Sequence, residues 1–332
     1  MSIYIPVVQK IYYSKPTYIE RVLPKQGELA VREGLTVDPV TRLGITKVSY
    51  GLMPIDKSLK IVKGRTDDGF FYKGERIGRV GLNYVIAPYN GYLSKEKDKY
   101  LYHQEDRDYR LMAGVWGTVT GVVKDKSTLI KTQTVDIPFT YSVGANISGE
   151  LVVFPNPSEL LELQYLEHYT KGAEGKVIYI GAYASSEFLE GAVQKKVRAV
   201  LAGGADKQSF IYAKRNNLFL GVFNGYGRLP VANVAYDFLK EISSRYVFID
   251  SKRNLLRVPV PEDFTFTHKI PTNASLKHLR EVVPGLQVQV FIKPYFGWFG
   301  EVESVQDDII YVNLHNAEEK LAVSVPNILA IA

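Results

Sequence analysis

The sequence predicts a multidomain protein of β and α/β type. Its 332 residues exceed the usual size of one domain, so two or three domains are expected. A hydrophobic fraction of 46% and a charged fraction of 23% are typical of chains with packed cores. The 23 Tyr and 15 Phe favour strands. Alternating apolar residues dominate the first half, and strands alternate with helical patterns further on.

Residues 1–155 are predicted to be β-rich, with short strands that end at Gly and Pro. The pattern Glu33-Gly34-x-x-Val37 returns as Lys73-Gly74-x-x-Ile77. Asn90-Gly91 is the strongest hairpin signal in this half. The charge-dense stretch 95–110 is expected to be an exposed insertion.

Over about residues 22–93, these phrases resemble the barrel-sandwich hybrid fold of lipoyl and biotinyl carriers, which also occurs in the RnfC family of electron-transfer subunits. Such carriers present a modifiable Lys at a hairpin tip, typically next to Met. Neither Lys63 nor Lys73 has this setting. The resemblance therefore implies an unmodified scaffold barrel.

A boundary is predicted at Pro155-Asn156-Pro157-Ser158, where Ser158 is a suitable N-cap for a helix through Leu166. Residues 156–260 then read as an α/β domain. Its strands are expected at 176–181, 197–202, 218–223 and 246–249, and its main helices at 185–196 and 230–243. This alternation predicts right-handed crossovers and a central, mainly parallel sheet.

The α/β domain holds the best candidate for a ligand site. Ligands of open parallel sheets bind beyond the C-terminal strand ends, near the following helix N-termini. The residues expected there form a candidate anion pocket: Gly181, Gly203, Gly204, Asn224, Gly225, Gly227 and Arg228. Glycines let a phosphate approach the backbone, and Arg228 adds positive charge. The alternative is that these glycines only make the turns between strands and helices. Gly203-Gly204 is expected to end the second strand of this domain.

Residues 261–282 are expected to form a linker, and residues 283–332 a small β-barrel. The barrel shows Gly285-x-x-Val288-x-Val290 and then Gly297-x-x-Gly300-x-Val302. Further strands are predicted at 309–312 and 321–325, followed by a closing turn at 326–329. This spacing resembles the KOW motif of ribosomal proteins and of the C-terminal domain of NusG-type transcription factors. The resemblance implies an SH3-like barrel and an association with RNA.

The distribution of charge changes what the barrel is expected to bind. Residues 283–332 carry two Lys/Arg against six Asp/Glu, whereas residues 171–257 carry 14 against seven. Phosphate binding depends on Lys and Arg, and Lys293 stands almost alone in the barrel. Tyr295, Phe296 and Trp298 are therefore predicted, with Lys293, to contact a protein partner. The alternative is that Phe296 and Trp298 fill the barrel.

Catalytic and metal-binding patterns are not found in the sequence. There is no Cys, and the histidines at 103, 168, 268, 278 and 315 lack metal-ligand spacing. No catalytic residue, metal or cofactor is therefore predicted. The lack of Cys, of a secretory signal and of a long apolar run favours a cytoplasmic protein without a membrane partner. The oligomeric state is left open.

These features favour a non-catalytic binding or scaffold protein, associated with the ribosome or with transcription through its barrel and its basic α/β face. The alternative is a phosphate- or nucleotide-binding accessory subunit or enzyme that uses the glycine-rich strand ends. An electron-transfer accessory role ranks last, because iron–sulfur clusters need Cys ligands. The order of the modules resembles a family of bacterial multidomain proteins, and it implies no catalytic residue.

Overall fold

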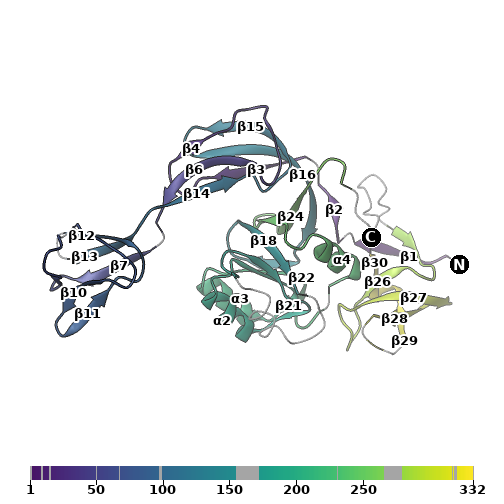
Figure 1. Ribbon diagram of the computed structural model, residues 1–332. Coiled ribbons are helices and arrows are strands. Elements are labelled where there is room, and N and C mark those ends of the chain that lie inside the picture. Colours follow the sequence, from purple (N-terminus) through teal and green to yellow (C-terminus); the bar gives the residue numbers. More distant parts are fainter. Residues whose placement is uncertain are drawn as a thin grey trace. The chain divides into compact units, whose positions relative to one another are not determined.

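The protein is mainly β, with several sheets, one of them mixed with parallel pairs, and three short helices among the described residues (Figure 1). The computed structural model describes residues 2–8, 10–14, 16–49, 51–66, 68–96, 99–154, 172–229, 231–264, 279–315, 317 and 320–331. The predicted boundary at Pro155, the helix predicted from Ser158 and most of the predicted linker lie outside these residues.

The chain forms two compact units, each built from separate segments. Unit 1 comprises Met1–Thr17, Gly114–Gly117 and Thr132–Ala332, and unit 2 comprises Tyr18–Ala113 and Thr118–Lys131. Strand β16 (Ser127–Pro138) begins in unit 2 and ends in unit 1. The domain boundaries inferred from the sequence stay a prediction.

A mixed sheet forms the centre of unit 1, with strands in the order β17-β22-β21-β19-β18-β23-β24-β16. The pairs β18–β19, β19–β21, β20–β21 and β21–β22 are parallel. The pairs from β18 to β16, and the pair of β17 with β22, are antiparallel. Of the four strands expected to be parallel, β19, β21 and β22 are parallel to one another, but the strand expected at 246–249 is antiparallel to both of its neighbours, so the sheet is mixed and not mainly parallel. The bounds are β2 (Tyr12–Tyr13), β17 (Tyr141–Val143), β18 (Ile147–Val153), β19 (Val177–Tyr179), β20 (Tyr183–Ala184), β21 (Ala199–Ala205), β22 (Phe219–Tyr226), β23 (Tyr246–Asp250) and β24 (Leu255–Val260).

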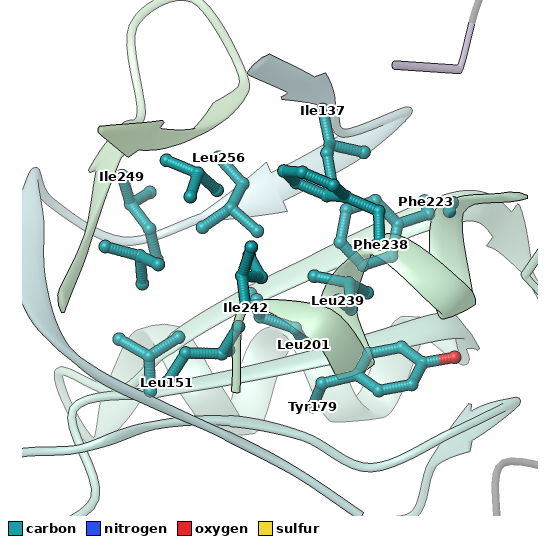
Figure 2. Packing of buried hydrophobic residues seen from close by; sticks show 14 of the residues in the cluster. Ile137, Leu151, Tyr179, Leu201, Phe223, Phe238, Leu239, Ile242, Ile249 and Leu256 are labelled. Carbon is teal, nitrogen blue, oxygen red and sulfur yellow. The ribbon is translucent and has the colours of Figure 1, made fainter. Parts of the chain in front are cut away.

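Helices cover both faces of this sheet. They are α2 (Ser186–Gln194), α3 (Lys207–Arg215) and α4 (Asn233–Glu241), and α2 and α4 confirm the two main predicted helices. Because neighbouring strand residues point to opposite faces, Tyr179 and Leu201 pack with α4 (Figure 2). Ile178 and Val200 pack with α2 and α3 on the other face. Within the described residues, no helix has the length and apolar character that a membrane crossing requires.

A second sheet in unit 1 joins both ends of the chain, in the order β25-β1-β30-β26-β27-β28-β29. The predicted strands are confirmed, but Ile328 and Leu329 begin a strand instead of belonging to a closing turn. The turn is the short 3₁₀ helix η2 (Val325–Asn327). The bounds are β1 (Tyr4–Val8), β25 (Leu279–Glu281), β26 (Gln287–Val290), β27 (Phe299–Gln306), β28 (Ile309–Leu314), β29 (Lys320–Ser324) and β30 (Ile328–Ile331).

Unit 2 contains the small sheets β14-β6-β4, β7-β13-β12-β9 and β11-β10-β8. The stretch expected to be an exposed insertion is instead β13 and β14, and Tyr102 on β13 is fully buried. The bounds are β3 (Thr17–Val22), β4 (Glu28–Leu29), β5 (Thr36–Val37), β6 (Arg42–Val48), β7 (Leu52–Asp56), β8 (Lys60–Ile61), β9 (Phe70–Phe71), β10 (Arg76–Val80), β11 (Asn83–Ile86), β12 (Gly91–Glu96), β13 (Lys99–Gln104), β14 (Arg107–Met112) and β15 (Gly117–Val123).

The hairpin prediction at Asn90-Gly91 is wrong, because β11 and β12 belong to different sheets. A side chain of Gly91 would collide with the backbone oxygen of His103 at 1.9 Å, so this glycine permits the close approach of β12 and β13. A two-residue hairpin turn lies at Gly81-Leu82, between β10 and β11.

Candidate functional site

Three strand ends lie side by side at one edge of the mixed sheet. β20 pairs with β21 through Ala184 and Ala205, and Ala205 pairs in turn with Tyr226 on β22. Because these pairs are parallel, their C-terminal ends meet, as expected for a ligand-binding edge. Gly181 lies just before β20, and Arg228 lies just after β22.

Four other residues of the predicted pocket lie inside strands. Gly203 and Gly204 belong to β21, which continues to Ala205, so the predicted end of this strand at the two glycines is wrong. Asn224 and Gly225 belong to β22. Gly225, inside β22, and Gly227, just after its end, have φ angles of 131° and 94°, which favour glycine.

The chain's own backbone covers the two glycines of β21. A Cβ atom on Gly203 would lie 1.7 Å from the backbone oxygen of Leu229, and one on Gly204 would lie 2.1 Å from that of Gly227. We call residues 227–229 the covering segment. The Gly203 and Gly204 amides donate to the oxygens of Gly181 and Ala182 at 2.8 and 2.9 Å. These glycines therefore serve the close approach of the covering segment, and their amides already have partners. The anion pocket stays a prediction.

Protein groups cap both helices that begin at this edge. The Phe188 amide donates to Ser185 Oγ at 3.1 Å, and the Ser209 amide donates to Asp206 Oδ1 at 2.7 Å. Tyr183 donates its hydroxyl hydrogen to Asp206 Oδ2 at 2.8 Å. The hydrogen bond from the Ser209 amide is the main cause that lowers the Asp206 pKa. A charged carboxylate thus occupies the N-terminus of α3.

The exposed Arg228 lies near the capped N-terminus of α3. Its guanidinium carbon is 5.8 Å from the ring centre of Tyr183, whose hydroxyl binds Asp206. Arg228 is therefore close to the α3 N-terminus, and it stands beside an acid whose charge opposes a bound anion.

An aromatic cluster that the sequence did not predict lies next to this edge. It consists of Tyr141 on β17, Phe210 on α3 and Tyr226 on β22. The ring centres of Tyr141 and Phe210 are 4.7 Å apart, those of Phe210 and Tyr226 are 5.7 Å apart, and those of Tyr141 and Tyr226 are 6.1 Å apart. Phe210 is buried, but Tyr141 and Tyr226 are 44% and 61% exposed. The rings come from separate segments, so no local pattern indicates their meeting.

The predicted partner-binding residues of the C-terminal sheet differ in exposure. Tyr295 and Trp298 are half-buried, pack against its core and contact each other with ring centres 5.4 Å apart. Phe296 is 55% exposed and lies 5.3 Å, between ring centres, from Phe291. Lys293 is exposed. Trp298 therefore contributes to packing, and Phe296 and Lys293 remain accessible.

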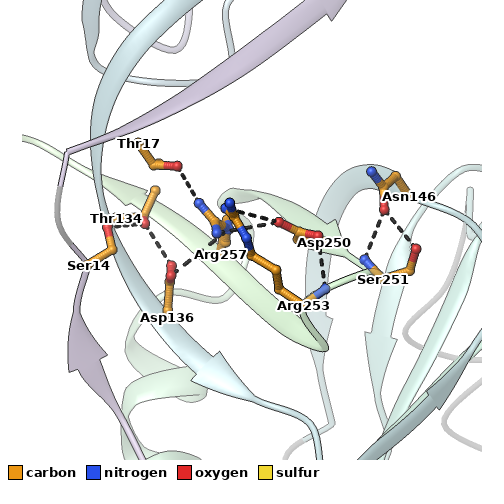
Figure 3. A network of polar contacts seen from close by, with 9 residues as sticks. All are labelled: Ser14, Thr17, Thr134, Asp136, Asn146, Asp250, Ser251, Arg253 and Arg257. Atoms are coloured by element: carbon orange, nitrogen blue, oxygen red, sulfur yellow. Dashed lines mark hydrogen bonds and ion pairs between the residues drawn. The ribbon is translucent and has the colours of Figure 1, made fainter.

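A buried polar network connects β16, β23 and β24 (Figure 3). Arg257 lies opposite Asp136 in the β16–β24 register, with 3.9 Å between Nε and Oδ2, and its Nη2 is 3.4 Å from Asp250 Oδ2. Thr134 donates to Asp136 Oδ1 at 2.7 Å, and Arg257 donates to Thr17 Oγ1. Burial is the main cause that raises the Asp136 pKa. Such a network holds strands together, and removing one partner of a buried ion pair costs about 3–5 kcal/mol.

Metal-site geometry is not found among the residues that the structure covers, since no three His, Cys, Asp or Glu side chains gather there. His103 and His315 lie in different units, and His168, His268 and His278 fall outside the described residues. His103 stacks on Tyr92 and bonds to Ser94 Oγ through Nε2 at 2.7 Å. These contacts account for its position without a ligand.

No family model matches the chain, and a search of curated proteins found no match.

Proposed function

We propose that the protein is a non-catalytic binding protein that contacts an anionic macromolecule through the basic face of its mixed sheet. The observation that carries this proposal is the charge of β21, α3, β22 and the covering segment. These elements present four exposed cations, Lys207, Lys214, Arg215 and Arg228. Asp206 is the single acid between residues 199 and 229, and it already binds an amide and a hydroxyl group.

RNA, on a ribosome or a transcript, is the proposed partner of this face, and a cytoplasmic location belongs to the same proposal. Clustered Lys and Arg bind phosphates by releasing counterions. The nucleotide-binding alternative is less well supported, because the amides of Gly203 and Gly204 bond within the chain. A phosphate at these amides would have to displace the covering segment.

The C-terminal sheet is proposed to be an SH3-like barrel of the KOW kind that docks a protein partner at Phe296 and Lys293. Support comes from the antiparallel order β26-β27-β28-β29 and from its single core of inward-facing apolar residues. The exposed ring of Phe296 suits an interface.

The small sheets of unit 2 are proposed to form a barrel-sandwich hybrid that acts as a scaffold. The tip of the β10–β11 hairpin is Gly81-Leu82, without Lys. Lys63 and Lys73 occupy other turns, spanning 62–65 and 72–75. Among the described turns of unit 2, neither Lys63 nor Lys73 thus occupies a hairpin tip, which supports a structural use of the fold over a carrier function at these two lysines.

Salt-dependent RNA binding tests the proposed function. Fluorescence anisotropy with a labelled, mixed-sequence RNA oligonucleotide is measured over a range of KCl concentrations. Combining Lys207→Gln, Lys214→Gln and Arg215→Gln is expected to weaken binding. The slope of log affinity against log salt is expected to fall by about 0.7 for each phosphate that the variant no longer neutralises.

The matched control combines Lys47→Gln, Lys57→Gln and Lys60→Gln, which remove the same charge from exposed positions of unit 2. It is expected to leave the slope unchanged. Equal slopes for the two triple variants, or no RNA binding by the wild type, would contradict the proposal.

A further inference from the structure

Two exposed tyrosine rings are held in place by a buried phenylalanine. Phe210 anchors the aromatic cluster from inside α3, and Tyr141 and Tyr226 pack against it and against each other. Exposed aromatic groups of this kind mark interaction sites more often than isolated apolar residues do. Because both rings are already ordered by these contacts, a ligand that stacks on them loses little side-chain entropy.

Positive charge lies beside these rings. Lys207 and Lys214 are three residues before and four residues after Phe210, so helical spacing places all three on one stripe of α3. Both lysines are exposed. The nearby Asp206, hydrogen-bonded to the Ser209 amide and to Tyr183, keeps its negative charge, but it is one acid against the four exposed cations of residues 199–229. The surroundings of the aromatic cluster therefore favour an anionic ligand with flat, stackable parts.

We propose that the aromatic cluster binds single-stranded nucleic acid, with unpaired bases stacked on Tyr141 and Tyr226 and phosphates bound by Lys207 and Lys214. This inference rests on the proposed function and specifies its partner. Exposed aromatic rings next to a basic strip are how proteins bind single strands without reading a sequence. A duplex hides the faces of its bases within the stack, so an unpaired strand suits these rings.

The test compares two labelled oligonucleotides of equal length, one with bases and one abasic, so that both carry the same phosphates. Anisotropy titration of the full-length protein is expected to show tighter binding of the oligonucleotide with bases. Each stacked base contributes about a 5- to 150-fold gain in affinity. Tyr226→Ala is expected to remove most of this preference, and Tyr226→Phe to retain it because the ring remains.

A matched control is Tyr72→Ala, since Tyr72 is also 61% exposed but lies in unit 2. It is expected to bind both oligonucleotides as the wild type does. Tyr141→Ala provides a second variant of the cluster, and thermal melting confirms that each variant is folded. Lys214→Gln is expected to weaken binding of both oligonucleotides equally.

The outcomes separate this inference from the proposed function. Equal affinity for the two oligonucleotides, tighter binding of a duplex, or an unchanged preference in Tyr226→Ala and Tyr141→Ala would overturn the stacking site. The proposed function would stand in these cases if the salt slope still depended on the α3 cations. If the wild type bound neither oligonucleotide nor RNA, both would fall.

Discussion

Lys10 places its ammonium group in an apolar environment in unit 1. Its Nζ lies 5.6 Å from the ring centre of Phe299, which is itself buried. Burial lowers the Lys10 pKa from 10.5 to about 8, since the charged form loses its hydration. The contact with the ring offsets part of this cost, as cation–π contacts do.

The stability of the protein is expected to depend on pH through Lys10. Below about pH 8 the amine is charged in both states, and the folded state bears the cost of its burial. Between about 8 and 10.5 the unfolded state keeps a proton that the folded state has released, so stability rises with pH. Lys10→Met is therefore expected to raise the free energy of unfolding at pH 7 by about 1–3 kcal/mol.

Urea unfolding at several pH values measures this effect. The advantage of Lys10→Met over the wild type is expected to shrink as the pH rises above 8. Lys252→Met, at an exposed position, serves as the control without such a trend. An advantage of Lys10→Met that stayed constant with pH would contradict the assignment of a buried charge.

At the scale of elements, glycine has two different uses in this chain. Gly34, Gly74 and Gly285 each have φ between 84° and 89° in a turn just before a strand. The residue three positions after each of them, Val37, Ile77 and Val288, is buried. This local requirement is visible as the Gly-x-x-Val pattern. Gly203, by contrast, is needed because a distant backbone segment touches it.

The contact between β21 and the covering segment predicts a large effect of Gly203→Ala. The new methyl group would lie 1.7 Å from the Leu229 oxygen, so the backbone must shift. Overpacking of this kind typically costs about 1–3 kcal/mol. In Gly121→Ala on β15, the nearest atom is Leu129 Cβ at 3.7 Å, and the expected change is within about 0.5 kcal/mol. Urea unfolding followed by circular dichroism compares the two, and equal stabilities would show that the covering segment moves freely.

At the scale of the whole molecule, unit 1 brings the two ends of the chain together. β1 pairs in parallel with β30 through Val7 and Ala330, and antiparallel with β25 through Ile5 and Arg280. Ile5 is fully buried in the core of the C-terminal sheet. Deleting residues 283–332 would also remove β30, one of the two partners of β1, so point substitutions give clearer tests of the barrel.

Ile5→Ala is expected to destabilise the C-terminal sheet by about 2–5 kcal/mol, because it leaves a cavity in that core. Tyr4→Ala is the matched control, since the Tyr4 side chain, next to Ile5 in the same strand, is 53% exposed. Urea unfolding is followed by the fluorescence of Trp298 in a Trp116→Phe background. An equal loss in both variants would contradict the placement of β1 in this sheet.

The candidate site was predictable only where the signal is local. The positions of Gly181, Gly227 and Arg228 near a strand-end edge follow from strands alternating with helices. The residues that carry the proposed nucleic-acid site were missed, because Tyr141, Phe210 and Tyr226 meet only through strand pairing and the placement of α3. The Asp136–Arg257 pair was missed for the same reason.

The sequence by itself determined the β-rich character, the helices α2 and α4, and the glycine turns that precede buried strands. Backbone preferences and hydrophobic periodicity act over a few neighbouring residues, so one sequence contains them. Only the tertiary structure decided that β1 joins the C-terminal sheet and that the covering segment lies on Gly203. It also decided that three distant rings form one cluster. Such contacts depend on which surfaces bury each other across long loops, and local patterns do not encode that choice.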